Sequence, residues 1–281
     1  MIVFLNGKFV PEEEAVVSVF DRGFLYGDGL FETFRVYRGI PFCWEQHMER
    51  MRHGAELLRL QVPHGSAELR GFADELIRRN QMPESLLRIT ITRGVGQRGY
   101  SPQGAEEPSL VMSLHPAPMV DAEHPAQWKL MVSSVRVPAK DLITQIKTCN
   151  KLSQVLARSE ADAAGAQEAL LVNTNGEIAE ASSSNLFWVE NGTVCTPTLA
   201  SGALPGVTRG LVLELCRLME LPTREVDTTP AQLNGAEAVF LSLTSMGIVE
   251  ATHLDGRELR RAPLVGKISR AYREWLETKC A

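Results

Sequence analysis

Two stretches of this sequence decide its interpretation: LITQIK, residues 142–147, and EIAEASSSNLF, residues 177–187. The first is mostly apolar and ends in Lys147, in a chain whose positive charge comes mainly from arginine. A lysine amine that is partly removed from water can form a Schiff base with a carbonyl cofactor. The second stretch places Glu180 ahead of small residues and a predicted strand, and a buried acid suits the opposite end of such a cofactor.

At these residues the chain resembles the fold-type IV enzymes that depend on pyridoxal 5'-phosphate (PLP), the aminotransferase class IV family. The resemblance covers about residues 1 to 275 and includes three further motifs: DRGFLYGDGLFET at 21–33, EQHMER at 45–50 and LPGVTR at 204–209. The family motif places the reactive lysine ahead of a helix that opens with Asn150 and Leu152. This selects Lys147 over its neighbour Lys151.

The resemblance implies a role for each end of the cofactor. Lys147 would hold PLP as a Schiff base and then move a proton as general base and acid. Glu180 would keep the pyridine nitrogen protonated, so that the ring withdraws electrons. Arg50, by its match to the family's acid-x-His-x-x-Arg segment, would bind the phosphate with its guanidinium, while His47 is interpreted as structural.

A second phosphate-binding element is predicted where a helix begins after Leu204-Pro205-Gly206. Free backbone N–H groups and the positive end of a helix bind anions, so Val207 and Thr208 are expected to contact the phosphate. The family match adds Thr244, which follows a buried strand. Ser182 and Ser184, within the serine run 182–184, are expected to offer hydroxyl groups to substrate or phosphate.

The stretch TRGVGQRGYS, residues 92–101, bears on the substrate. Its glycines surround Arg98 and predict a mobile loop whose guanidinium and Tyr100 phenol recognise a carboxylate. The loop resembles aminodeoxychorismate lyases, whereas Thr208 and the serine run look more like aminotransferases. Phe31 is a predicted substrate contact, at a position where D-amino-acid aminotransferases place a tyrosine. Leu152 stands where branched-chain aminotransferases usually place a tyrosine.

Composition excludes several classes of protein. The net charge of −5 and the lack of a basic block interleaved with aromatic residues argue against a nucleic-acid partner. No apolar run is long enough for a membrane span. The five cysteines are scattered without a C-x-x-C pair, so no metal site is expected and a reducing, cytoplasmic compartment fits. The resemblance implies a homodimer.

Strands and helices are mixed along the chain, which indicates α/β or α+β character. A hairpin is predicted at 2–10, strands at 30–37, 86–93 and 108–114, and helices at 44–59 and 66–79. The prolines of 115–118 favour an extended linker, so a boundary is placed at 118–122. The resemblance implies a small N-terminal α/β domain, 1–118, a larger barrel-like PLP-binding domain, 122–281, and a cofactor in the cleft between them.

The second half is predicted to contain strands near 128–135, 168–173, 185–189, 193–196 and 238–243. Helices are expected from just after Lys147 to Gly165, and over 206–219 and 262–278. The favoured function is a PLP-dependent aminotransferase working between an amino acid and a 2-oxo acid. The alternative is 4-amino-4-deoxychorismate lyase, which forms 4-aminobenzoate and pyruvate for folate synthesis.

Overall fold

The computed structural model describes residues 1–121 and 125–280. The chain divides into two compact units. The first contains Met1–Ala117, Ile146–Lys151 and Glu277–Ala281, and the second contains Pro118–Gln145 and Leu152–Leu276. Within these ranges, residues 122–124 and 281 lie outside the described part. The predicted boundary at 118–122 therefore falls partly outside it, as does the first residue of the predicted second domain.

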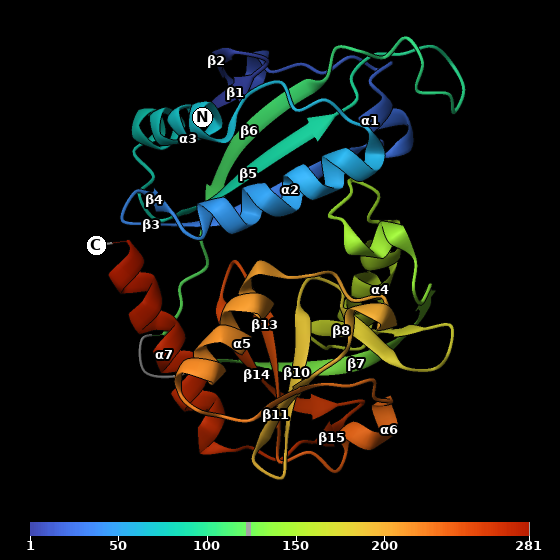
Figure 1. Cartoon of the computed structure of the whole chain (residues 1–281), viewed down its shortest axis with the longest axis vertical. Coiled ribbons are helices and arrows are strands. Elements are labelled where there is room, and N and C mark those ends of the chain that lie inside the picture. The colour runs from blue at the N-terminus through green and yellow to red at the C-terminus, as the bar shows by residue number, and fades with distance from the viewer. Residues whose placement is uncertain (122–124, 281) are drawn as a thin grey trace. The chain divides into compact units, whose positions relative to one another are not determined.

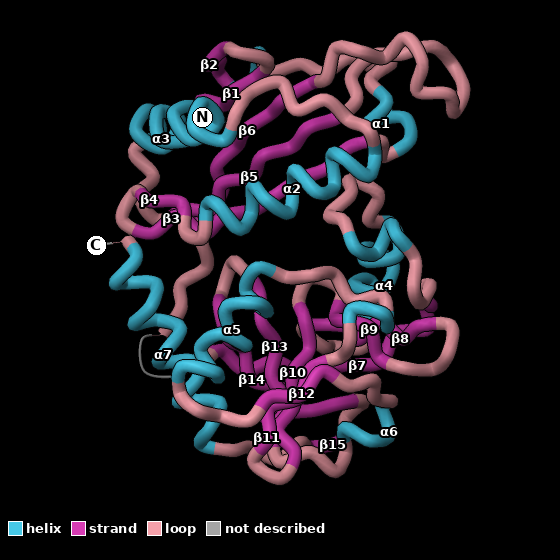
Figure 2. The backbone as a smooth tube through the Cα atoms, viewed as in Figure 1, coloured by secondary structure: helices cyan, strands magenta, loops and turns pink. Residues whose placement is uncertain are grey.

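The first unit is built on a six-stranded sheet in the order β2-β1-β6-β5-β3-β4 (Figures 1 and 2). All its neighbouring strands pair antiparallel. The strands are β1 (Ile2–Leu5), β2 (Lys8–Pro11), β3 (Gly29–Tyr37), β4 (Ile40–Pro41), β5 (Ser85–Thr92) and β6 (Ser109–Pro116). The helical segments are η1 (Glu12–Glu14), α1 (Arg22–Tyr26), α2 (Trp44–Leu58) and α3 (Ser66–Asn80).

One face of this sheet packs against α2 and α3 because apolar side chains alternate along the strands and recur at helical spacing. Phe34, Leu87 and Met112 from the sheet are buried together with Met51 and Leu76 from the helices. Alternation in β3 sends Phe31, Thr33 and Arg35 to the opposite face, where they are only half buried. That second face is the one available for function.

The second unit contains a curled sheet in the order β12-β11-β10-β13-β14-β7-β8-β9, with β15 paired to β14. Its strands are β7 (Ala126–Val137), β8 (Glu168–Asn173), β9 (Ile178–Ala181), β10 (Asn185–Glu190), β11 (Thr193–Thr196), β12 (Thr223–Glu225), β13 (Ala238–Leu243), β14 (Gly247–Leu254) and β15 (Arg257–Glu258). The helical segments are η2 (Leu142–Gln145), α4 (Leu152–Ala163), η3 (Leu199–Ser201), α5 (Val207–Leu218), α6 (Pro230–Leu233) and α7 (Pro263–Lys279).

The predicted fold class, mixed α/β with a barrel-like second half, is confirmed, and most predicted elements are present within a few residues. Five strands were not predicted: β4, β9, β12, β14 and β15. β9 has only four residues and contains Glu180, ahead of the strand that was predicted at 185–189. β14 contains Glu250, a buried acid. Its ion pair with Arg261 offsets the free-energy cost of burying the charge.

The segment that carries Lys147 belongs to the first unit, which differs from the expectation of a single second domain over 122–281. The reason is backbone pairing: Phe31 N–H donates to the Lys147 carbonyl at 3.0 Å, and Cys149 N–H donates to the Gly29 carbonyl at 2.9 Å. Gly27 allows this approach. Its φ of +67° favours glycine, and a Cβ there would lie 3.0 Å from the Cβ of Asn150.

Within the part of the chain that the structure describes, no helix is both long enough and apolar enough to cross a membrane.

Candidate active site

Lys147 lies in the loop between η2 and α4, and its side chain is half buried. Its Nζ lies 4.7 Å from the centre of the Phe31 ring. The helix that was expected just after it begins five residues later, at Leu152. The pairing of residues 147 and 149 with the start of β3 fixes the lysine beside the half-buried face of the first sheet.

Arg88 is a residue that sequence reasoning missed. It lies on β5 opposite Thr33, and its guanidinium carbon is 3.7 Å from the centre of the Phe31 ring. Its Nε donates to Thr90 Oγ1 at 3.1 Å, and burial lowers its pKa. The signal in the sequence was the one charged residue in this strand, whose sequence is SLLRITIT.

Arg88 differs from the other buried or half-buried arginines of this unit because none of the carboxylates in residues 1–121 and 125–280 pairs with it. Each of the others does pair with an acid. These pairs are Arg22–Asp28, Arg35–Glu84, Arg50–Glu32, Arg70–Asp74 and Arg93–Asp28. Arg88 is therefore a cation available to an anionic ligand, on the same sheet face as Phe31.

Arg50 is not a solvated surface arginine. On α2, its Nε and Nη2 donate to the two carboxylate oxygens of Glu32 at 2.7 and 2.6 Å, and its side chain is only 9% exposed. His47 Nδ1 lies 2.7 Å from the same carboxylate. Burial opposes ionisation of Glu32, but Arg50 and His47 together lower its pKa to about 2.

His47 connects this cluster to Lys147. Burial lowers the pKa of His47, although the adjacent Glu32 opposes this shift, and the charges of Arg50 and Lys147 lower it further. His47 is therefore neutral and donates its Nδ1 proton to the ionised Glu32. His47 was interpreted as structural, and here it holds Glu32. Because the charges of Arg50 and Lys147 both act on the His47 ring, the two cations lie near the same side chain.

In the second unit, Glu180 is held by two donors. The Leu204 N–H donates to its Oε2 at 3.0 Å, and Asn185 Nδ2 donates to the same oxygen at 3.2 Å. Asn185 also donates to the Leu204 carbonyl at 2.9 Å. Donors to a carboxylate favour its charged form, which is the form that a pyridinium requires. The sequence did not indicate Asn185.

Asn185 also lies against the start of α5. Gly206 is the N-cap residue of this helix, and a Cβ there would lie 1.9 Å from Asn185 Oδ1, so only glycine fits. No side chain of the N-cap residue satisfies the first N–H groups, which begin at Val207 and the buried Thr208. These groups and the helix dipole give α5 the character of an anion site.

Two buried hydroxyl groups lie near this helix start. Ser184 and Ser242 are 7% and 2% exposed, and their Oγ atoms lack a hydrogen-bond partner among the described residues. β10 pairs with β13 so that Asn185 stands opposite Ser242, and α5 packs on β13. Thr244 follows the end of β13 and is half buried. Because buried hydroxyls without partners are rare, these two suggest a ligand.

The other serines of the run are already bonded within the protein. Ser182 and Ser183 donate their hydroxyl protons to Glu168, a fully buried acid on β8, the latter at 2.5 Å. Sequence reasoning expected Ser182 to contact substrate, and it did not identify Glu168. The signal was an acid that begins a buried strand.

Arg98 and Tyr100 lie in the long loop between β5 and β6 (Figure 1). Both side chains are exposed, that of Tyr100 to 88%. The structure thus brings Lys147, Phe31, Arg50 and Arg88 together on one unit. It gathers Glu180, Ser184, Val207 and Thr208 on the other, with Thr244 after a neighbouring strand. It leaves Arg98 and Tyr100 at the surface of the first.

Comparison with known proteins gives this arrangement a family. The family model for amino-transferase class IV matches residues 29–254. The chain therefore belongs to the class IV aminotransferase family, the fold-type IV group of PLP-dependent enzymes.

Three curated relatives differ in the activity that their names give. The chain is 34% identical to a putative branched-chain-amino-acid aminotransferase of Methanocaldococcus jannaschii, over 98% of this chain and 94% of the relative. It is 28% identical to a D-alanine aminotransferase of Listeria monocytogenes, over 100% and 98%. It is 31% identical to an aminodeoxychorismate lyase of Bacillus subtilis, over 90% and 87%.

Solved structures share the whole fold. The branched-chain aminotransferase of Thermoproteus uzoniensis, solved with norvaline, has a TM-score of 0.92 at 30% identity, covering 99% of this chain and 95% of that one. The branched-chain amino acid aminotransferase of T.th., complexed with N-(5'-phosphopyridoxyl)-L-glutamate, has a TM-score of 0.88 at 29% identity, covering 97% and 92%.

Proposed function

We propose that this chain is a PLP-dependent aminotransferase that moves an amino group between an amino acid and a 2-oxo acid. The observation that carries the proposal is the position of Asn185, which bonds to Glu180 and also packs against Gly206 at the start of α5. One unit therefore offers a carboxylate and an anion site close together. PLP needs both, because its ring nitrogen is basic and its phosphate is anionic.

The residues present fit PLP on structural grounds. The unpartnered hydroxyls of Ser184 and Ser242 can donate to a phosphate, as can the first N–H groups of α5 and the hydroxyls of Thr208 and Thr244. Arg50 adds a guanidinium, aligned by its bonds to Glu32. Lys147 supplies a half-buried amine for the covalent link.

When bound, PLP supplies an electron sink for the negative charge that develops at the substrate α carbon. Glu180 would stabilise the protonated ring nitrogen, and the two donors to its carboxylate, Leu204 N–H and Asn185 Nδ2, align it. Lys147 Nζ carries the proton to and from the substrate carbon. Glu168 orients the serine run through Ser182 and Ser183.

On the substrate side, we propose that Phe31 and Arg88 contact the amino acid. Arg88 has no acid partner among the described residues and lies against the same ring as Lys147, so it can bind a substrate carboxylate near the reacting amine. Arg98 and Tyr100 are proposed to recognise a carboxylate from their exposed loop. Ser182 contacts substrate only if it gives up its bond to Glu168.

The second candidate function is 4-amino-4-deoxychorismate lyase, which forms 4-aminobenzoate and pyruvate. It is favoured by the RGYS stretch at 98–101, whose arginine and phenol are exposed to an incoming ligand, and by the similarity to the Bacillus subtilis lyase. Both reactions would need a cofactor that withdraws electrons from the substrate and a base that accepts a proton from it, so the residues already named serve either one.

One preparation of the PLP-loaded enzyme, assayed against two sets of substrates, tests the proposal. The first set contains D- and L-amino acids with 2-oxoglutarate, and the second contains aminodeoxychorismate. Formation of L- or D-glutamate supports the aminotransferase. Release of pyruvate and 4-aminobenzoate without amino transfer would replace it with the lyase, and failure to bind PLP would refute both.

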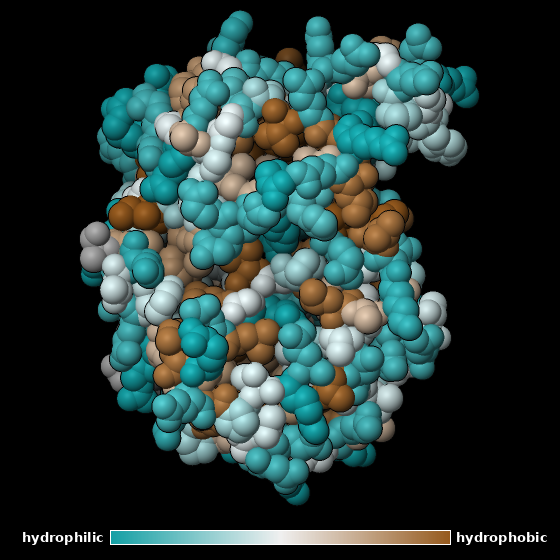
Figure 3. All heavy atoms as spheres, in the orientation of Figure 1, coloured by the Kyte–Doolittle hydropathy of each residue, from teal (hydrophilic) through white to brown (hydrophobic). Residues whose placement is uncertain are grey.

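We also propose that the enzyme works as a homodimer in a reducing, cytoplasmic compartment. Several large apolar side chains on the first unit are exposed, including Val19, Phe20 and Phe24 around α1, and Figure 3 shows apolar side chains at the surface. All five cysteines are free thiols. Light scattering of the purified protein tests the dimer, and a monomeric mass would refute it.

A further inference from the structure

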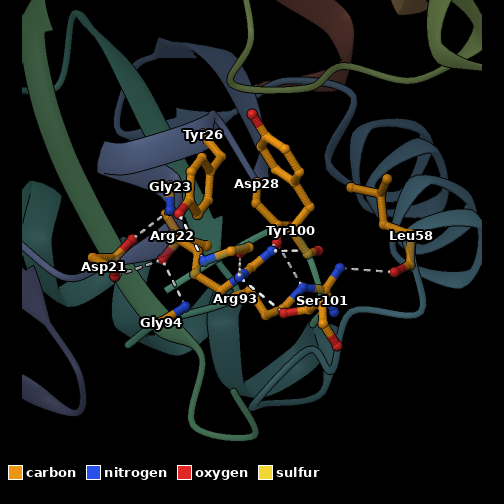
Figure 4. Close-up of polar contacts among 12 residues, drawn as sticks. Asp21, Arg22, Gly23, Tyr26, Asp28, Leu58, Arg93, Gly94, Tyr100 and Ser101 are labelled. Carbon is orange, nitrogen blue, oxygen red and sulfur yellow. Dashed lines mark hydrogen bonds and ion pairs between the residues drawn. The ribbon is translucent and has the colours of Figure 1, made fainter. Parts of the chain in front are cut away.

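Arg22 forms a set of bonds that the proposed function does not use. It lies on α1 and is 3% exposed. Its Nη1 donates to the carbonyls of Gly99 and Ser101 at 2.9 and 3.0 Å, and its Nη2 donates to the carbonyl of Tyr100 at 3.1 Å (Figure 4). One guanidinium thus binds three successive carbonyls of the loop that carries Arg98.

The local charge favours this arrangement. Asp28 accepts from Arg22 Nε at 2.9 Å and from Arg93 Nε at 2.8 Å. Burial opposes ionisation of Asp28, but the two arginines lower its pKa overall. One carboxylate between two guanidinium groups leaves an excess positive charge, and buried charge is stable only when polar groups surround it. The loop carbonyls supply these groups for Arg22.

The loop packs closely around Arg22 and α1. A Cβ on Gly96 would lie 3.0 Å from Arg22 Cδ and 2.9 Å from the Cβ of Ala105, so any larger residue there would push the loop away from Arg22. The Gly99 N–H donates to the Tyr26 hydroxyl at 3.3 Å, and the rings of Tyr26 and Tyr100 meet edge to face at 5.6 Å. The sequence suggested that the loop glycines allow motion, but Gly94 and Gly96 have a steric reason: a Cβ on Gly94 would lie 1.8 Å from the Glu107 carbonyl oxygen.

We propose that Arg22 is a positioning residue for substrate recognition: it fixes the backbone of residues 99–101 so that Arg98 and Tyr100 are presented to a substrate carboxylate. This inference rests on the proposed function of those two residues. Arg22 bonds only to backbone carbonyls of the loop, which leaves the exposed side chains of Arg98 and Tyr100 for the ligand. A loop ordered in advance loses less conformational entropy when it binds.

Arg93 provides a matched control. It is also buried, at 8% exposure, and it shares Asp28 with Arg22. Its remaining bonds go to the carbonyls of Leu58 and Arg59, at the end of α2, at 2.9 and 3.1 Å. Replacing either arginine by lysine keeps the charge but removes the fork of donors. Loss of general stability should therefore affect both variants, whereas loss of loop order should affect only Arg22→Lys.

The first measurement is limited digestion of the PLP-loaded enzyme with trypsin, followed by mass mapping of cleavage after Arg98. We expect Arg22→Lys to raise the rate of this cleavage about tenfold or more, the scale for loss of charged hydrogen bonds, with little change at other sites. Arg93→Lys should not raise it selectively. Because Arg22→Lys could fold poorly, Gly96→Ala is a second variant that displaces the loop and leaves every charge in place.

The second measurement is steady-state kinetics. We expect Arg22→Lys and Gly96→Ala to raise KM for carboxylate substrates about tenfold, with a smaller change in kcat and little change for amines without a carboxylate. The cofactor absorbance should stay that of wild type. Combining Arg22→Lys with Arg98→Ala should add little to the KM of Arg98→Ala alone, since both act on one contact.

Unchanged cleavage after Arg98 in Arg22→Lys would overturn the inference, as would equal changes of KM in Arg22→Lys and Arg93→Lys. Additive effects of Arg22→Lys and Arg98→Ala would also overturn it, because Arg22 would then act through some other group. A wild-type enzyme inactive toward every substrate would refute the proposed function instead. Faster cleavage after Arg98 in Arg22→Lys would still support the part of the inference that concerns loop order.

Discussion

Arg50 binds both carboxylate oxygens of Glu32 through two of its nitrogens, at 2.7 and 2.6 Å, inside the first unit. Glu32 is fully buried and also meets His47, so the cluster contains one anion, one guanidinium and one neutral imidazole. A buried pair of this kind does little for stability compared with apolar packing, but loss of one member is costly. The pair therefore aligns the Arg50 guanidinium, and each partner can be tested separately.

We expect Glu32→Gln to be less stable than wild type at pH 7, with a difference that shrinks in acid. The folded-state pKa of Glu32 is about 2, below its ordinary value of 4.5, so ionisation favours the fold. This contribution is present above about pH 4.5 and is lost as pH falls toward 2. The drop in pKa from 4.5 to about 2 corresponds to a contribution of about 3 kcal/mol to the free energy of unfolding. Urea unfolding of the two proteins at pH 7 and again near pH 2 measures how the difference in stability changes.

Glu75→Gln is the control for that experiment. Two arginines, Arg78 and Arg79, also lower the pKa of Glu75 to about 2, but this acid lies on the surface of α3. Solvent screens such pairs, so Glu75→Gln should change stability much less. Equal losses in the two variants would show that burial does not distinguish Glu32.

For Arg50→Ala we expect PLP affinity to fall about tenfold to hundredfold, the scale for a charged hydrogen bond worth about 1.5–3 kcal/mol. The variant also leaves Glu32 buried without its guanidinium. The double variant Glu32→Gln, Arg50→Ala removes both charges and should recover stability without recovering PLP affinity. Recovery of both would mean that Arg50 affects PLP only through the fold.

Lys147 is expected to carry the cofactor. Borohydride reduction of the PLP-loaded enzyme followed by peptide mapping should find the pyridoxyl group on Lys147, because its amine lies against Phe31 on the half-buried sheet face. Lys151→Ala, which removes the rival lysine, should keep the label. A label on Lys151 in the wild type would contradict the assignment.

Glu180→Gln should retain PLP but lose most of kcat. A glutamine oxygen can still accept the bonds from Leu204 and Asn185, so the local shape is kept. A neutral amide cannot stabilise a protonated ring nitrogen as a carboxylate does. Absorbance titration with PLP and turnover of the best substrate measure the two effects, and near-normal kcat would exclude Glu180 as the ring partner.

Arg88 and Arg98 are both proposed to bind a substrate carboxylate, and single variants separate their contributions. Arg88→Met and Arg98→Ala should each raise KM for dicarboxylate substrates about tenfold if each binds one carboxylate, and much less for amines without one. A rise in only one variant identifies the residue that binds. Arg35→Met is a control on the same sheet face, because Arg35 is already paired with Glu84. Equal changes with amines and amino acids would indicate a structural role for either arginine.

Local patterns made most of the elements predictable. The spacing of Trp44, Met48 and Met51 indicated α2, and the apolar run at 238–243 indicated β13. Apolar periodicity did not reveal strands that are short or that contain a buried charge. β9 has only four residues, and the buried Glu250 in β14 is tolerated because of its pairing with Arg261, a contact that no local pattern contains.

By itself the sequence determined the family, the class of fold and the residue types of the candidate site, because these depend on local periodicity and on motifs that each lie within a few residues. Tertiary structure decided the partners: Glu32 for Arg50, Asn185 for Glu180, Glu168 for Ser182 and the loop carbonyls for Arg22. These groups meet across as many as 79 residues of chain. Their hydrogen bonds depend on strand register and helix packing, which place distant side chains within about 3 Å of each other.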